Sequence, residues 1–249
     1  MDGMIINGLQ GDGAIQSYYN DAAAQEMVYQ TGGGGGDSPT GGFKLEKGDA
    51  IQELEVAYET YGKLGPARDN VIFICPTLTS DAHAAGYHGE DEKTRGWWDE
   101  MIGPGKGIDT RHYYVVCANI LGGCKGTTGP ASVNPRTSRA YGSAFPRLTV
   151  CDMVNAHKLL LDHLGVKGLA AVVGGSLGGM QALEYAIRYP DMVRHCICIA
   201  TATELSAQAL AFDIVGREAI ISDPGWQGGD YYGTGNAPAR SAHSSSMKS

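Results

Sequence analysis

The spacing of hydrophobic residues changes abruptly at one point in the second half of the chain. Residues 169–173 are all apolar and lie between glycines, which is typical of a fully buried strand. From Leu177 to the residue before Pro190, apolar side chains recur every three or four positions, which predicts an amphipathic helix. Ser176 lies at the junction, with one glycine two residues before it and another two residues after it.

A serine in this position matches a nucleophile elbow, in which a strained turn raises the hydroxyl above the sheet. A side chain at Gly174 or Gly178 would collide with the strand or the helix, so both positions need glycine. The N–H groups and dipole at the helix start would stabilise an oxyanion. The alternative is a packing turn without chemistry, since 37 glycines produce such patterns by chance. The flanking strand and helix favour Ser176 as a nucleophile.

Other parts of the chain repeat this alternation of apolar runs and helical periods. The predicted strands are 71–75, 112–118, 169–173 and 195–200. The predicted helices, which all follow the second of these strands, are 150–164, 177–189 and 206–221. Thr149 and Asp152 have the spacing of a capping box, and Gly165 ends the helix that follows. Strands and helices in this order predict an α/β protein with a mostly parallel, doubly wound sheet that is covered on both faces.

The two ends of the chain differ from this pattern. Residues 1–42 include five consecutive glycines and bury too little apolar surface to offset their backbone entropy, so we expect a disordered tail. An alternating segment at 43–59 predicts a hairpin at a sheet edge. Residues 241–249 are rich in serine and are expected to be unstructured. The folded core is therefore predicted to span 43–240.

Composition narrows the classes of function. The formal net charge is −8 and no basic run occurs, which argues against a nucleic-acid partner. No stretch approaches about 18 uninterrupted apolar residues, so no membrane span is expected. The first residues do not resemble a secretory signal, which favours a cytoplasmic protein.

Cysteine and histidine positions give no metal-ligand pattern. There is no Cys-x-x-Cys pair, and most of the six cysteines lie in apolar runs, so we expect reduced thiols in the core, including Cys75, Cys117, Cys196 and Cys198. His83 and His88 lie in a predicted loop and could act as metal ligands or as bases. We favour the alternative that both are solvated loop residues without such a role. The sequence predicts no metal site.

Several motifs, in their order along the chain, resemble the homoserine O-acetyltransferases. The matching segments are 58–62, 78–83, 97–99, 102–106, 121–124, 128–130, 174–184, 199–201 and 223–231. The resemblance covers about 43–240 and implies the α/β-hydrolase fold and a homodimer. It also implies transfer of an acetyl group from acetyl-CoA, a cosubstrate, to the hydroxyl of L-homoserine in methionine biosynthesis, with no bound cofactor.

The resemblance also assigns roles to individual residues. Ser176 corresponds to the nucleophile that becomes acylated, and the backbone N–H groups of Leu177 and Leu78 correspond to the oxyanion hole. The implied mechanism is ping-pong. Pro76 and Ser80 stand where many relatives have histidine and glycine, which alters the loop that carries the second oxyanion donor.

The sequence offers no convincing general base for Ser176. The family's catalytic aspartate and histidine would lie beyond residue 249, so the C-terminal part of the fold is expected to be missing. His195 opens a strand that is expected at the edge of the sheet remote from Ser176, and His243 lies in the serine-rich tail. We therefore expect a nearly inactive chain with exposed apolar surface. A serine esterase and a non-catalytic fragment remain the alternatives.

Overall fold

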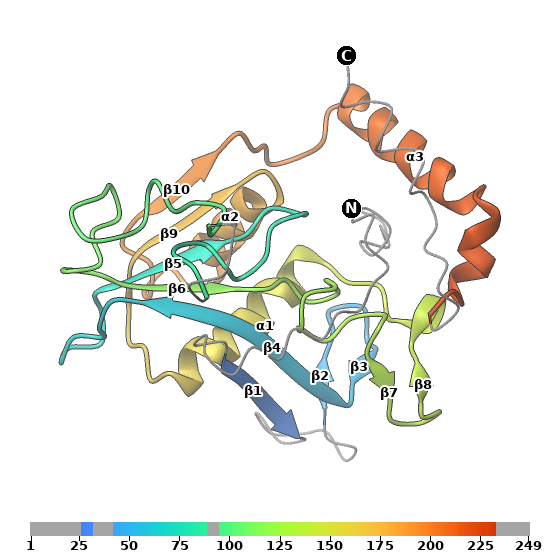
Figure 1. The fold of residues 1–249 in the computed structure, drawn as a ribbon, viewed down its shortest axis with the longest axis horizontal. Helices are drawn as coiled ribbons and strands as arrows, with labels where there is room; N and C mark the ends of the chain where they lie inside the picture. The colour runs from blue at the N-terminus through green and yellow to red at the C-terminus, as the bar shows by residue number, and fades with distance from the viewer. Residues whose placement is uncertain (1–25, 32–41, 89–94, 233–249) are drawn as a thin grey trace.

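The fold is built on one central sheet (Figure 1). The computed structural model describes residues 26–31, 42–88 and 95–232. In the described part of the chain the sheet has six strands in the order β1-β4-β6-β5-β9-β10. These strands are β1 (Glu26–Thr31), β4 (Glu53–Tyr61), β5 (Val71–Cys75), β6 (Tyr114–Ala118), β9 (Leu169–Gly175) and β10 (Cys196–Ile199). The helices are α1 (Val150–His163), α2 (Leu177–Arg188) and α3 (Ala207–Ile221), with short 3-10 helices η2 (Gly142–Ala144) and η3 (Pro224–Gly229).

The strand directions confirm the predicted α/β class. Strands β6, β5, β9 and β10 run parallel to one another, while β4 is antiparallel to β6 and β1 is antiparallel to β4. The sheet is therefore mostly parallel, as the alternation of strands and helices predicted. Two small antiparallel pairs, β2 (Phe43–Lys44) with β3 (Ala50–Ile51) and β7 (Val133–Asn134) with β8 (Arg139–Ala140), lie outside it.

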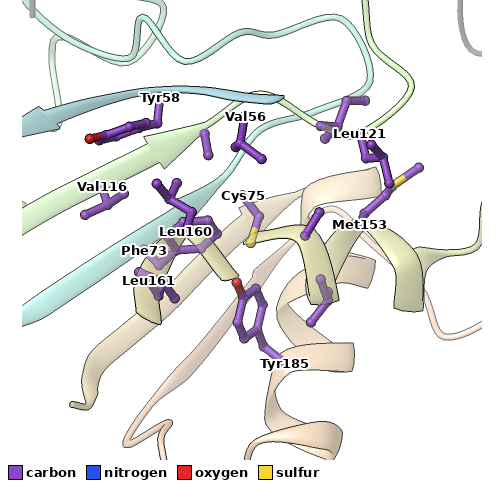
Figure 2. Close-up of a cluster of buried hydrophobic side chains, with 14 of the residues drawn as sticks. Val56, Tyr58, Phe73, Cys75, Val116, Leu121, Met153, Leu160, Leu161 and Tyr185 are labelled. Atoms are coloured by element: carbon purple, nitrogen blue, oxygen red, sulfur yellow. The ribbon is translucent and has the colours of Figure 1, made fainter. Parts of the chain in front are cut away.

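Helices α1 and α2 cover one face of the sheet and enclose the larger hydrophobic core. Figure 2 shows side chains of β4, β5 and β6 meeting those of the two helices. Phe73 of β5 lies at the centre, with its ring centroid 5.2 Å from that of His157 on α1 and 5.4 Å from that of Tyr185 on α2. All three side chains are fully buried, so this contact fixes both helices against the middle of the sheet.

An irregular segment covers the opposite face. Within residues 84–108, side chains such as Ala84, Ile102 and Ile108 pack with Ile74 and Val115 of the sheet in a second buried cluster. The sheet is thus covered on both faces, as predicted, and in the described residues the cover of this face is a loop. The apolar residues of β5 and β6 require a cover but do not specify its form.

Two predictions about the N-terminal region also need correction. Residues 26–31, which the predicted tail included, form β1, in which Val28 is paired with Val56. Strand β4 consequently lies between β1 and β6 and is not an edge strand. The valine, tyrosine and threonine of β1 favour an extended strand, but the glycines that follow dominate the composition of the region.

The capping box before α1 is confirmed. The Thr149 side chain accepts a hydrogen bond from the Asp152 N–H, and the Asp152 carboxylate accepts one from the Thr149 N–H. Asp152 is fully buried, and its second oxygen accepts a hydrogen bond from the Glu46 N–H at 2.8 Å. Gly165 follows the helix at φ +70, a conformation that favours glycine. The cap therefore joins α1 to the β2–β3 hairpin.

Strand β10 and helix α3 expose much apolar surface. Phe212 and Val215 of α3 are 70% and 66% exposed, and Ile197 of β10 is 46% exposed. This confirms the expectation of exposed apolar surface. In the part of the chain that the structure describes, no helix is both long and apolar enough to cross a membrane.

The cysteine prediction holds for the central strands and fails at β10. Cys75 and Cys117 are buried, whereas Cys196 and Cys198 are exposed. The reason is that β10, which carries them, is the last strand of the described sheet and pairs with β9 alone. Their sulfur atoms lie 3.6 Å apart on the side facing α2. The Cys196 sulfur is partly buried against the Ala182 carbonyl oxygen of α2, and this partial burial, together with the neighbouring thiol, raises the pKa of Cys196 to about 11, so it stays protonated at neutral pH.

The buried His157 predicts an acid-sensitive core. Burial lowers its pKa from 6.5 to about 4, so between these values the unfolded chain binds more protons than the folded one. The free energy of unfolding should therefore fall by about 2 kcal/mol between about pH 7 and about pH 5 through this residue. His157→Gln keeps a donor for the Asn119 carbonyl oxygen, which lies 3.0 Å from His157 Nε2. In urea titrations the variant should lose less stability over this pH range, and an unchanged pH dependence would refute the assignment.

Candidate active site

Ser176 occupies the turn between β9 and α2, as the sequence predicted (Figure 1). Its backbone has φ 52 and ψ −123, a strained conformation for a residue with a side chain. Ser176 is exposed to solvent, while Leu177 immediately after it is buried. The strained turn thus presents the serine at the surface, at the carboxyl end of a central parallel strand.

The two glycines of the motif allow a very close approach of strand and helix. A Cβ atom at Gly178 would overlap the carbonyl oxygen of Cys75, and one at Gly174 would overlap the carbonyl oxygen of Gly178. Gly175 differs, because a Cβ there would be 3.7 Å from its nearest neighbour, the carbonyl oxygen of Ile199. The steric reason given for Gly174 and Gly178 is confirmed.

Strand β10 and Thr201, which follows it, hold the turn through two hydrogen bonds. The Ser176 N–H donates to the Ile199 carbonyl oxygen at 3.0 Å, and the Thr201 hydroxyl donates to the Ser176 carbonyl oxygen at 2.7 Å. Thr201 also fills the space above Gly179, where a Cβ would be 2.6 Å from the threonine Cβ. The sequence analysis assigned no role to Thr201, although it lies in a segment shared with the acetyltransferases.

The loop after β5 lies against the start of α2. Leu177 is the first residue of α2, so its N–H has no partner within the helix. Leu78 is half-buried in the loop and packs against the main core. The buried Gln181 donates to the Pro76 carbonyl oxygen at 3.5 Å and to the Leu177 carbonyl oxygen at 3.4 Å, which links the two segments. Gln181 is a residue that sequence reasoning missed, since a glutamine on a helix carries no local signal.

The loop substitutions at Pro76 and Ser80 are accommodated within the turn. Pro76 is buried, and the hydroxyl groups of Thr77 and Ser80 lie 2.6 Å apart in a hydrogen bond across the turn. The Ser80 side chain thereby takes part in closing the loop.

Neither candidate histidine supplies a base for Ser176 in the described ranges. His195 is exposed, and its Nδ1 lies 2.8 Å from the Ala170 carbonyl oxygen, at the opposite end of β9 from Ser176. His243 lies outside the described residues. Among the residues that the structure describes, no histidine or carboxylate forms a hydrogen bond with the Ser176 hydroxyl. The described site therefore contains a nucleophile candidate, and the Leu177 and Leu78 N–H groups stay predicted oxyanion donors.

A second polar cluster lies further along the sheet and corrects the prediction for the loop histidines. His83 and His88 are not solvated, because their side chains are 12% and 21% exposed and both contact the carboxylate of Glu59 on β4. Tyr61 also donates to this carboxylate, at 2.7 Å. Burial by itself raises the pKa of Glu59. The hydrogen bonds from the two histidines and from Tyr61 together outweigh this effect, so the pKa lies below its ordinary value.

Comparison with known proteins supports the resemblance seen in the sequence. A homoserine O-acetyltransferase from Methanococcoides burtonii is 55% identical over 192 residues, which are 77% of this chain and 39% of the relative. The chain thus spans less than half the length of this curated relative.

Two solved structures share the fold. The X-ray structure of homoserine O-acetyltransferase from Bacillus anthracis has a TM-score of 0.74 and 36% identity, and the match covers 83% of this chain and 54% of that one. The crystal structure of esterase E22 has a TM-score of 0.77 and 34% identity, and the match covers 85% and 56% of the two chains.

The family model described as alpha/beta hydrolase fold matches residues 70–247, more than half of the sequence. Its range includes β5, the strained turn at Ser176 and α2, the elements from which the site is built. The chain belongs to the alpha/beta hydrolase fold family.

Proposed function

We propose that this chain carries the nucleophile and the oxyanion donors of an O-acyltransferase that moves an acetyl group from acetyl-CoA to the hydroxyl of L-homoserine, a step toward methionine. The observation that carries the proposal is the exposed Ser176 in a strained turn between a parallel strand and a helix. The similarity to homoserine O-acetyltransferases supports the choice of the acetyl group and of the acceptor. From the same resemblance we propose a cytoplasmic homodimer with no bound cofactor at this site.

The proposed reaction has two acyl transfers. Ser176 Oγ attacks the thioester carbon of acetyl-CoA, the C–S bond breaks, and CoA leaves as the thiol with the serine proton. The homoserine hydroxyl then attacks the acetyl-serine, the ester bond to Ser176 breaks, and the acceptor's proton returns to the serine. In each step the N–H groups of Leu177 and Leu78 are proposed to stabilise the oxyanion.

Both transfers need a base that accepts and returns the proton. No such group contacts Ser176 within the described residues, so we expect the chain by itself to react slowly. Loss of a triad member costs serine hydrolases about 10⁴–10⁶-fold in rate, while the backbone donors and binding still contribute. Slow acylation of Ser176 is therefore the measurable consequence.

A serine esterase is the second candidate. The similarity of the fold to that of esterase E22 favours it, because the same strained serine and backbone donors serve both reactions. The two candidates differ in the group that accepts the acyl chain. An esterase transfers it to water, whereas the proposed transferase requires the hydroxyl of homoserine.

The proposal predicts acylation of Ser176. After prolonged incubation with acetyl-CoA, mass spectrometry should detect one acetyl group on the peptide that contains Ser176. Ser176→Ala should remove the adduct, while Ser143→Ala, at an exposed serine, should keep it. A chain without an adduct at Ser176 would support the non-catalytic fragment and contradict the proposal.

The proposal also predicts that the acyl group is transferred to L-homoserine. Release of CoA thiol, followed with a thiol reagent, should increase when L-homoserine is added and should yield O-acetylhomoserine. L-serine and L-threonine serve as comparison acceptors. Release that is independent of homoserine, together with hydrolysis of a simple acetyl ester, would identify an esterase and refute the transferase.

A further inference from the structure

The cluster at Glu59 is separate from Ser176. Glu59 on β4 is paired with Cys117 on β6, and β4 lies three strands away from β9, the strand that leads to Ser176. At about 4.8 Å per strand, β4 and β9 are about 14 Å apart within the sheet. Glu59 therefore comes from a strand that does not carry the proposed nucleophile.

Two imidazoles converge on the one carboxylate. His83 Nδ1 lies 3.0 Å from Glu59 Oε2, and His88 Nε2 lies 2.8 Å from Glu59 Oε1. The centroids of the two histidine rings are 3.7 Å apart, and one ligand atom from each of the three residues lies within 4.8 Å of the other two. Three metal-ligating groups from two separate segments thus share one small volume.

The surroundings keep the carboxylate in position. The Glu59 side chain is only 6% exposed. The Tyr61 hydroxyl donates to Glu59 Oε2 and itself accepts the N–H groups of Ala84 and Ala85 at 2.8 and 3.0 Å. Such outer hydrogen bonds orient the ligands of a metal and are part of its site.

We propose that Glu59, His83 and His88 bind one divalent transition-metal ion of the zinc class. Two imidazole nitrogens and one carboxylate oxygen form a known protein ligand set for zinc, with water in the fourth position. Neighbouring ligands of tetrahedral zinc are about 3.3 Å apart, as follows from metal–ligand bonds of about 2.0–2.1 Å. The two N···O contacts of 3.0 and 2.8 Å are a few tenths of an ångström shorter than this spacing, and all three ligand atoms already lie within 4.8 Å of one another.

The alternative is a hydrogen-bonded cluster in which each histidine donates an N–H to Glu59. The same ring orientation directs a lone pair toward this volume in the other tautomer, with the proton on the remote ring nitrogen. A neutral histidine can therefore exchange the hydrogen bond for a metal bond without losing a proton. Metal affinity distinguishes the two arrangements.

An ion at this position would also restrain the loop after β5. Glu59 belongs to the sheet, whereas His83 and His88 belong to the loop that includes Leu78. The metal would join the loop to β4 independently of Gln181, which joins it to α2.

The test uses the full chain, stripped of metal with a chelator and titrated with Zn²⁺ by calorimetry and with Co²⁺ by visible absorption. We expect one ion per chain and the intense absorption bands of four-coordinate Co²⁺. His88→Gln, at the most exposed of the three ligands, should weaken Zn²⁺ binding at least about tenfold, since even outer-sphere changes have effects of that size. His112→Gln, at an exposed histidine, should leave binding unchanged.

A second measurement needs no variant. In the unmodified chain, Zn²⁺ should protect His83 and His88 from acylation by diethyl pyrocarbonate, while His112 stays reactive. Binding that is absent or far below one ion per chain would overturn the proposal and leave a hydrogen-bonded cluster. Equal Zn²⁺ affinity in folded His88→Gln, or no protection of the two histidines, would overturn it as well.

Discussion

The site depends on the contact between the first turn of α2 and the end of β5. Gly178 lies so close to the carbonyl oxygens of Cys75 and Pro76 that no side chain fits there. This approach forces the sharp turn at Ser176 and places the loop with Leu78 beside the start of the helix. The proposed nucleophile and the proposed oxyanion donors thus lie on segments that are positioned by packing of the backbone, which needs no base among the described residues.

The rest of the sheet supports this contact from both sides. Phe73 anchors α1 and α2 to β5, and Thr201 after β10 holds the carbonyl group of Ser176. On the far side, the Thr127 and Thr128 hydroxyl groups accept hydrogen bonds from backbone N–H groups of β4 at 2.9 and 2.8 Å. Rigid elements therefore carry the proposed site, whereas the exposed α3 contributes little to it.

Local patterns in the sequence predicted the features that neighbouring residues determine. The change of period at Ser176 and the capping box at Thr149 are of this kind, because strand, turn and cap preferences act over a few residues. Features that depend on distant partners were missed. The burial of His83 depends on Glu59, 24 positions earlier in the chain, and the exposure of Cys196 depends on which strand ends the sheet. Neither relationship has a local signal.

The free energy of unfolding of two glycine variants tests the close approach of β5 and α2 most directly. Gly175 and Gly178 flank Ser176 within one motif, but only Gly178 lacks room for a Cβ atom. In urea denaturation, Gly178→Ala should lose about 3 kcal/mol or more, as overpacking against a fixed backbone does, and Gly175→Ala should lose about 1 kcal/mol or less. Equal stability of the two variants would contradict the account.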